Sequence, residues 1–495
     1  MMLRLQRASV TERIALYALL GLTVFRLIVA VWLPVTPDEA YYWTWSRHLQ
    51  FSYLDHPPMV ALWIHFGTML FGDTAFGIRV MAPLAAAAGT VIAVLATKEF
   101  LACRKEETPE TGDIRPLVTG ILLNAMLAVG TGAVLMTPDT PLLFFVTLFL
   151  WAAGKLLRTG DAGWWLLLGL NAGLGFDSKY TMVLPIAGLG AWCLLRPTGR
   201  RFLLTFWPWV GLCLAALLST PVVWWNATHG WASFIRQGGR TGDWHPARAF
   251  SYIGELLGGQ IGLLTPGIFL LAIVACVRAA RRRDDADRLL VCLIAVPCAV
   301  FLQHALGDRV QPNWPVIVYP VLAIVIAMSG MKGWKPAVWL GYGMWAVVIV
   351  QSATGLLPLN RHLDVTLRQS GGWEAFAQDI GRASKGADFV MSDEYGVASE
   401  LALRLKGREI VGAELLRWPF FELPLATCTK GWVLLVHNAR RSFTPGTPWA
   451  EAGQPVGEII RSRNGREAER YGLYRVVCPI PSPTAEWLRE LPSAR

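Results

Sequence analysis

Charged residues are scarce in this chain of 495 residues, of which they make up only 16%. An average soluble domain carries roughly 25% charged residues. Because 54% of the sequence is hydrophobic and its mean hydropathy is +0.41, the composition predicts a polytopic membrane protein. The net charge of +10 does not indicate a nucleic-acid partner, and we expect none. The basic residues of the chain cluster in short loops between apolar runs, as expected for the cytoplasmic loops of a membrane protein.

The sequence also shows no cysteine motif and no signal-peptide cleavage site before Thr36. None of the eight cysteines forms a Cys-x-x-Cys pair, which argues against a zinc or redox centre. Six lie in or near apolar runs, but Cys428 and Cys478 lie in the polar C-terminal segment and could pair in an oxidising compartment. The first apolar run is too long for a signal peptide, and no small-x-small cleavage site precedes Thr36. We therefore expect a retained anchor helix.

Eleven apolar runs are candidates for transmembrane helices, each of which needs about 20 residues to span the bilayer. The fifth and sixth runs are the short ones among them. The candidates cover residues 14–33, 77–98, 116–135, 141–157, 164–177, 181–195, 203–222, 256–277, 289–305, 314–330 and 336–356.

Basic residues mark one side of the membrane. They precede the first run and follow the second, fourth, sixth, eighth and tenth, so all six loops are cytoplasmic if the N-terminus is cytoplasmic. The other side then receives the first loop (34–76), the loop 223–255 and the whole tail after about residue 357. Within the first loop, Met59–Phe71 is too short to span, and we expect an interfacial helix there.

The tail differs in kind from the rest of the chain. The stretches ADFVMSD, REIVG, GWVLLVHNA and the pair GEIIRS and GLYRVV are typical of strands. Trp373–Ser384 and Val397–Leu405 have helical patterning. About 135 residues can bury a core of their own. The sequence therefore predicts a helical membrane domain over residues 1–356 and a small extracytoplasmic α/β domain over 357–495.

The first loop carries an unusual stretch, Thr36–Pro58, which reads TPDEAYYWTWSRHLQFSYLDHPP. Its six aromatic residues are typical of a membrane interface. An interface does not account for Asp38, Glu39, Asp55 and His56, because carboxylates beside an apolar boundary lose hydration and need partners. These four residues are therefore candidates for function.

The tripeptide Thr-Pro-Asp occurs twice, at 36–38 and 137–139, at the expected outer ends of two spans. It is a sound helix start, because proline tolerates the first turn and aspartate complements the helix dipole. A capping role and a functional role for Asp139 are therefore both open. For Asp38 we favour function, because Glu39 and the aromatic run follow at once.

Other outer loops supply cationic and neutral donors, which would suit the phosphate of a lipid beside an apolar wall. A solvated or interfacial role remains an alternative for each. The candidates are Lys179, Arg236, Arg240 and His229.

An acid beside a lipid phosphate permits displacement at the anomeric carbon of a lipid-linked sugar. A carboxylate takes the proton of the acceptor hydroxyl, while fixed cations or a metal offset the charge of the leaving phosphate. Asp38 is the candidate base, or else a residue that positions the acceptor or a metal. Asp55, His56 and Tyr42 are candidates for contacts to donor or acceptor, or for a divalent metal. One acid and one imidazole do not complete a metal site.

Six motifs resemble a known family. PDEAYYW, DHPP, MTPDTPLLFF, GFDSKYT, VVWWNATHGWASF and QPNWPVIVYP occur in this order. They are similar to motifs of bacterial glycosyltransferase family 39-like membrane proteins of the GT-C superfamily. That superfamily includes protein mannosyltransferase-like, lipid A galacturonosyltransferase-like and aminoarabinose transferase-like enzymes. The resemblance covers nearly all of residues 10–330.

The resemblance implies a GT-C fold with the first outer loop in the active site. It also implies an inverting hexosyl- or pentosyltransferase of the bacterial inner membrane, with its tail in the periplasm. The donor would be a polyprenyl-phosphate sugar, and the acceptor lipid A, lipopolysaccharide or another envelope glycan.

Site residues follow from the same resemblance. The family's first-loop acid falls on Asp38, with Glu39 beside it, its second outer acid on Asp139, and its SK lysine on Lys179. The aminoarabinose branch has Glu-Lys before Pro-Pro, where this chain has Asp55-His56. That departure fits the branch that resembles the galacturonosyltransferases better.

Two other classes of protein are alternatives to a glycosyltransferase. A transporter or flippase of a lipid-linked saccharide should carry ionisable groups at mid-membrane depth or paired broken helices, and the apolar runs are nearly free of central charges. An interaction protein whose tail binds envelope partners would leave the acids of the first loop without a purpose.

Overall fold

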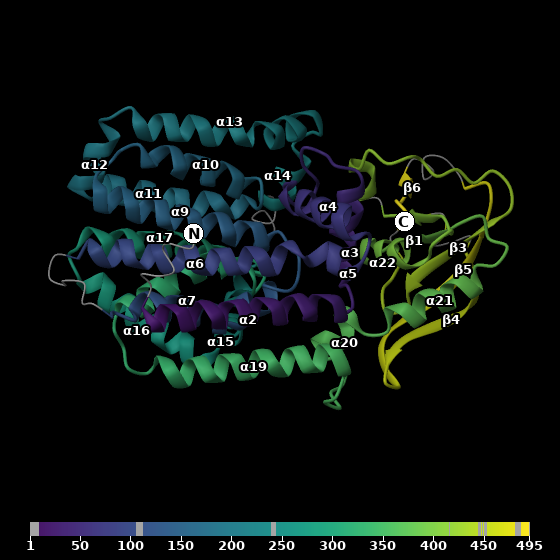
Figure 1. Cartoon of the computed structure of the whole chain (residues 1–495). Helices are drawn as coiled ribbons and strands as arrows, with labels where there is room; N and C mark the ends of the chain where they lie inside the picture. The colour runs from purple at the N-terminus through teal and green to yellow at the C-terminus, as the bar shows by residue number, and fades with distance from the viewer. Residues whose placement is uncertain are drawn as a thin grey trace. The chain divides into compact units, whose positions relative to one another are not determined.

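The structure, a computed structural model, describes most of the chain (Figure 1). The described residues are 9–104, 112–238, 244–414, 416–443, 447, 449, 453–480 and 487–494.

The chain divides into two compact units. We call them the helical unit, made of Met1–Ile28, Asp55–Val60 and Met81–Ala346, and the mixed unit, made of Val29–Leu54, Ala61–Val80 and Val347–Arg495. By its internal contacts, most of the first loop therefore groups with the C-terminal segment. The predicted domain boundary after residue 356 stays a prediction.

The helical unit consists of α-helices and short 3-10 helices among the residues described. In this unit α13, α10, α9 and α6 lie side by side in that order (Figure 1). The elements are α2 (Val10–Trp32, up to Ile28), α6 (Met81–Ala102), α7 (Arg115–Ala125), α8 (Leu127–Gly132), α9 (Asp139–Thr159), α10 (Trp164–Phe176), η1 (Tyr180–Met182), α11 (Val183–Leu195), α12 (Pro197–Leu203), α13 (Trp207–Thr228), α14 (Ala232–Gly238), η3 (Pro246–Arg248), α15 (Ala249–Leu264), α16 (Pro266–Arg281), α17 (Asp285–Ala305), η4 (Trp314–Val318), α18 (Tyr319–Met328) and α19 (Trp334–Thr354, up to Ala346).

Small residues let these helices approach closely. A Cβ added at Gly169 of α10 would lie 2.1 Å from the carbonyl oxygen of Gly211 in α13. Because lipid tails are as apolar as side chains, helices in a membrane associate through such close packing instead of through hydrophobic burial. The glycine pair therefore fixes the contact between α10 and α13.

Six helices in the described part of the chain are long and apolar enough to cross a membrane, or seven if one bent pair counts as a span. Four further apolar helices are shorter, and each expected run lies in a helix or a helix pair. The chain is thus a mainly helical membrane protein, while the total of about 11 spans stays a prediction. The six are Val10–Trp32, Ala75–Ala102, Asp139–Thr159, Trp207–Thr228, Asp285–Ala305 and Trp334–Thr354.

The candidate span over residues 256–277 is broken into two helices. The chain bends by 105° between Pro246–Leu264 and Pro266–Arg281. Thr265 has a positive φ of 75°, and Pro266 cannot donate a backbone hydrogen bond to the preceding turn. The threonine-proline step therefore ends one helix and starts the next.

The mixed unit contains a six-stranded sheet in the order β4-β5-β3-β1-β2-β6. β1 pairs in parallel with β2 and β3, and the other pairings are antiparallel. All three residues of β1 are buried, as expected for a parallel strand that is covered on both faces. The strands are β1 (Val390–Ser392), β2 (Ile410–Gly412), β3 (Trp432–Asn438), β4 (Gln454–Arg463), β5 (Arg466–Val477) and β6 (Arg489–Glu490).

Helices from both ends of the sequence complete the mixed unit. The strands and helices expected in the C-terminal segment are present, and Met59–Phe71 of the first loop is helical. α3 of the first loop packs against α22 of the C-terminal segment. The helices are α3 (Pro37–Arg47), α4 (Met59–Phe71, which begins in the helical unit), α5 (Ala75–Arg79), α20 (Val365–Ser370), α21 (Trp373–Ala383), α22 (Tyr395–Arg404) and η5 (Trp418–Phe420).

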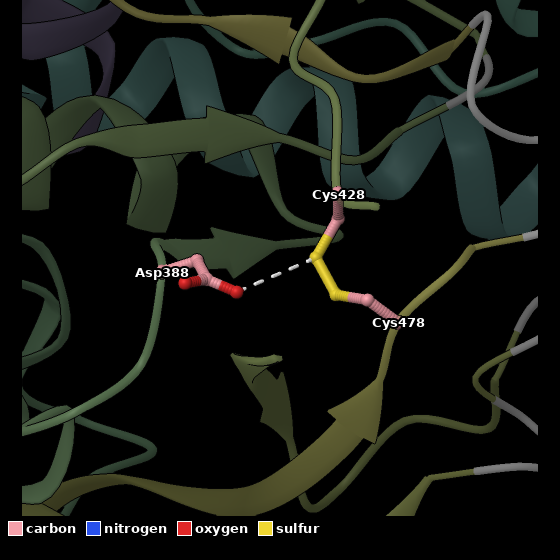
Figure 2. Close-up of a disulfide and its surroundings, with 3 residues drawn as sticks. All are labelled: Asp388, Cys428 and Cys478. Atoms are coloured by element: carbon pink, nitrogen blue, oxygen red, sulfur yellow. Dashed lines mark hydrogen bonds between the residues drawn. A yellow bond between two sulfur atoms is a disulfide. The ribbon is translucent and has the colours of Figure 1, made fainter. Parts of the chain in front are cut away.

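A disulfide joins Cys428 and Cys478, with the Asp388 carboxylate beside it (Figure 2). Asp388 Oδ2 lies 3.8 Å from Cys428 Sγ. The pairing that the sequence left open is therefore made, and it ties the segment before β3 to the end of β5.

Candidate active site

The acidic end of the first loop is the start of α3. Thr36 is the N-cap: its Oγ1 accepts a hydrogen bond from the Glu39 N–H at 3.4 Å, and the Glu39 carboxylate accepts one from the Thr36 N–H at 3.0 Å. Pro37 occupies the first helical position. This capping box places Asp38 in the first turn, where the helix dipole favours a negative charge.

Glu39 is committed to a buried ion pair. Arg79 Nε donates to Glu39 Oε1 at 2.6 Å, and both side chains are fully buried. Arg79 also donates to the carbonyl oxygens of Leu33 and Pro34. The guanidinium therefore holds the chain just before α3, and a direct catalytic role for Glu39 stays a prediction.

Asp38 has a partner from far along the chain. The hydroxyl of Tyr395, at the start of α22, donates to Asp38 Oδ1 at 3.0 Å. No sequence motif linked these two residues.

The aromatic residues of α3 are packed inside the mixed unit. Tyr41 contacts Trp418 edge-on at 5.7 Å, and Trp45 stacks on Tyr53 at 4.3 Å. Tyr42 is buried and meets the Trp45 ring at 4.9 Å. These rings anchor α3 to the C-terminal segment, so a membrane interface does not explain them.

In the helical unit, Lys179 and Asp139 form an ion pair. Lys179 Nζ lies 2.7 Å from Asp139 Oδ1, and Asn313 Nδ2 donates to Asp139 Oδ2 at 3.0 Å. The second Thr-Pro-Asp thus starts α9 as expected, but its carboxylate binds two other segments. Lys179 is buried with its charge compensated, which differs from a lysine extended to the interface.

Asp55 and Arg236 form a second ion pair in the same unit. Arg236 Nε donates to Asp55 Oδ1 at 2.6 Å, and the Gln237 side chain donates to the Asp55 carbonyl oxygen at 2.6 Å. Each candidate cation that can be placed here therefore has a candidate acid as its partner.

Two contacts connect these pairs. The Met59 N–H donates to the Asp177 carbonyl oxygen at 3.0 Å, and the Tyr180 and Ser233 hydroxyls share a hydrogen bond of 2.8 Å. Asp177 Oδ1 is buried without a hydrogen-bond partner among the described residues. The turn around Lys179 is thus linked both to the DHPP segment and to α14.

The remaining candidates, His229, His56 and Arg240, are not members of the two ion pairs described above. His229 Nδ1 donates a hydrogen bond to the Trp225 carbonyl oxygen, and its ring stacks on that of Trp225 at 4.1 Å, so it caps its own helix. His56 is half-buried next to Asp55, and Arg240 lies outside the described residues.

The described residues give little support for a bound metal ion. There, the group of three acidic or sulfur ligands within reach of one ion is Asp388, Cys428 and Cys478, and its two sulfurs are joined in the disulfide. Asp55 and His56 do not assemble with a third such ligand among the residues described.

Sequence reasoning missed four residues: Arg79, Gln237, Asn313 and Tyr395. Asn313 lies in the QPNWP motif, which the resemblance had already marked, and Arg79 is a lone charge at the expected start of a span. Either signal could have identified its residue. Gln237 and Tyr395 carried no such signal.

Comparisons with known proteins show what this chain is similar to. The family described as dolichyl-phosphate-mannose-protein mannosyltransferase matches residues 55–225. Lipid A galacturonosyltransferase RgtD of Rhizobium johnstonii is 26% identical over 418 residues, which cover 80% of this chain and 83% of that protein.

An undecaprenyl phosphate-alpha-4-amino-4-deoxy-L-arabinose arabinosyl transferase of Erwinia tasmaniensis is 26% identical over 355 residues, which cover 64% of this chain and 58% of that protein. The crystal structure of ArnT from Cupriavidus metallidurans bound to undecaprenyl phosphate matches with a TM-score of 0.60 and 14% identity. This match covers 96% of this chain and 100% of that one, and it shows the shared fold. The chain is therefore similar in sequence to membrane glycosyltransferases of this kind, and it shares the fold of ArnT.

Proposed function

We propose that this enzyme is an inverting glycosyltransferase that moves a sugar from a polyprenyl phosphate to a periplasmic acceptor. The observation that carries the proposal is the buried pair of Lys179 and Asp139 with Asn313. A cation held at the ends of apolar helices suits the phosphate of a lipid carrier. The printed names of the relatives, which include lipid A and undecaprenyl phosphate, support the same substrate classes.

The phosphate of the donor would bind the cations of the two ion pairs. Lys179 and Arg236 are each neutralised by a carboxylate. An incoming phosphate would share those cations, arginine with paired donors and lysine as a compact charge. We assign Arg240 and His229 as further phosphate contacts, and Asp55, His56 and Tyr42 as contacts to donor or acceptor.

The chemistry is a single displacement. The acceptor hydroxyl oxygen forms a bond to the anomeric carbon, and the bond from that carbon to the phosphate oxygen breaks. Asp38 takes the hydroxyl proton, and the polyprenyl phosphate leaves with the bonding electrons. Lys179 offsets the charge on the leaving phosphate, Asp139 holds Lys179, and Glu39 supports Asp38 through α3.

The acceptor would be lipid A or another envelope glycan. The relative that covers most of both chains is a lipid A galacturonosyltransferase by name. The basic loops predict a cytoplasmic N-terminus, which places Asp38 and the C-terminal segment on the periplasmic side of the inner membrane.

The test incubates the purified protein with a panel of undecaprenyl-phosphate sugars and with lipid A or polysaccharide acceptors, and detects products by mass spectrometry. Asp38→Asn should abolish turnover while donor binding is retained. Asp379→Asn, on the exposed face of α21, is the matched control and should keep full activity. A transporter would return the donor intact.

Full activity of Asp38→Asn would overturn the assignment of the base. A cysteine-accessibility map that places position 38 in the cytoplasm would overturn the topology.

A further inference from the structure

We propose that Tyr395, which the C-terminal segment contributes, is a positioning residue for Asp38. The inference rests on the proposed function, in which Asp38 accepts the proton of the acceptor hydroxyl. Its basis is the hydrogen bond of 3.0 Å from the Tyr395 hydroxyl to Asp38 Oδ1, across 357 positions of the sequence.

The contact depends on a close approach of two helix starts. A Cβ added at Gly396 would lie 2.8 Å from Pro37 Cβ, closer than real Cβ contacts allow. Gly396 and Pro37 are the chain neighbours of Tyr395 and Asp38. Glycine at 396 therefore lets the N-terminal ends of α22 and α3 come near enough for the phenol to reach the carboxylate.

The Tyr395 ring is held from more than one direction. The Tyr41 ring lies at 4.6 Å between centroids, and Arg417 Cζ lies 4.2 Å from the Tyr395 ring centroid. Arg417 is itself paired with Glu414, which follows β2. A guanidinium over an aromatic face is attractive, and its positive charge makes the phenol a stronger hydrogen-bond donor.

The residues just before Tyr395 are fixed by the neighbouring strand. Asp393 Oδ2 lies 2.7 Å from His437 Nδ1, and Glu394 pairs with Arg441 at 2.8 Å. Asp393 follows β1 and His437 lies at the end of β3, so both come from the carboxyl ends of parallel strands, where α/β sheets commonly build sites.

The expected effect of Tyr395 on Asp38 is electrostatic as well as geometric. A hydrogen bond to one carboxylate oxygen restricts the rotation of the group and stabilises its charged form. The charged form is the one that accepts a proton. Tyr395 acts through Asp38, so it is a positioning residue and not a catalytic one.

The experiment compares Tyr395→Phe with the wild-type enzyme across a pH series, using the donor and acceptor pair that the product assay identifies. Phenylalanine keeps the ring packing and removes only the hydroxyl. We expect kcat to fall by about 10-fold to 100-fold, the loss typical of a hydrogen bond to a charged group, with the donor KM unchanged. The acid limb of kcat/KM should move to higher pH, because less of the base is charged at a given pH.

Tyr474→Phe, in β5 of the same sheet, is the matched control and should leave both kcat and the pH profile unchanged. If Tyr395→Phe has the wild-type kcat and acid limb, the proposal is overturned. If it only lowers the amount of folded protein, with an unchanged kcat and pH profile for the folded fraction, Tyr395 is a structural brace and the proposal is also overturned.

Failure of the proposed function would look different. A wild-type enzyme that forms no product with any donor, or an Asp38→Asn variant with full activity, removes the premise. A functional wild type and an inactive Asp38→Asn, together with an unaffected Tyr395→Phe, reject the positioning role alone.

Discussion

Lys179 Nζ lies 2.7 Å from Asp139 Oδ1, and only 7% and 15% of the two side chains are exposed. A lysine charge in an apolar setting needs an anion. Here the protein supplies one from the start of α9, and Asn313 fixes the second carboxylate oxygen. The lysine is therefore held in place before any phosphate arrives.

This arrangement predicts that Lys179→Met loses activity. Removing a group that we propose to stabilise the leaving phosphate should lower kcat/KM by about 100-fold to 1,000-fold. Lys179→Arg should restore part of it, because the charge returns. Steady-state kinetics in detergent or proteoliposomes measure the effect.

Lys155→Met is the control for that substitution, because Lys155 also lies in a partly buried ion pair, with Glu99, on the predicted cytoplasmic side. It should have near wild-type kinetics. Equal losses in the two variants would contradict a specific role for Lys179.

Arg79→Met should destabilise the mixed unit. The substitution leaves the buried Glu39 carboxylate without its cation, a change that typically costs about 3–5 kcal/mol. Thermal unfolding of the purified protein should show a lower melting temperature, and Arg79→Met with Glu39→Gln should recover part of the loss. Arg382→Ala removes an exposed pair with Asp379 and should change little. An unchanged melting temperature for Arg79→Met would show that the buried pair is dispensable.

The disulfide gives a test of both stability and compartment. Cys428 and Cys478 are 50 positions apart, and loss of such a link typically costs about 2–4 kcal/mol. Cys428→Ser with Cys478→Ser should unfold at a lower temperature, whereas Cys213→Ser should not. In the wild type, alkylation of these two cysteines should require prior reduction. Free thiols at both positions in protein isolated under alkylating conditions would contradict an oxidising compartment.

His437 predicts a pH-dependent stability. Asp393 and the Arg441 carbonyl oxygen accept from its two ring nitrogens, and against the opposing effect of burial they raise its pKa above 6.5. A raised folded-state pKa gives stabilisation that is complete below about pH 6.5 and is lost as pH rises through the raised value.

The difference in melting temperature between the wild type and His437→Gln should therefore shrink from pH 6 to pH 9. His362→Gln, in an exposed loop, is the control and should show no such trend. A difference that stays constant with pH would show that His437 does not titrate in this range.

The local secondary structure could be predicted from the sequence. The apolar runs form helices. The strands of the C-terminal segment lie in runs of β-branched and aromatic residues that are bounded by turn residues. Thr36-Pro37-Asp38 starts a helix with the expected cap. The membrane class and the similarity to membrane glycosyltransferases were predicted correctly, because composition, periodicity and motif order are properties of the sequence itself.

Contacts between residues that lie far apart in the sequence were decided by the tertiary structure alone. Sequence reasoning proposed Asp139, Lys179, Asp55 and Arg236 as candidates, but it had no means of joining them, because ion pairs depend on which helix ends meet. For the same reason the sequence did not show that Tyr395 lies beside Asp38, and it left open whether Cys428 pairs with Cys478. The break at Thr265 was missed because hydropathy continues through it, whereas backbone geometry does not.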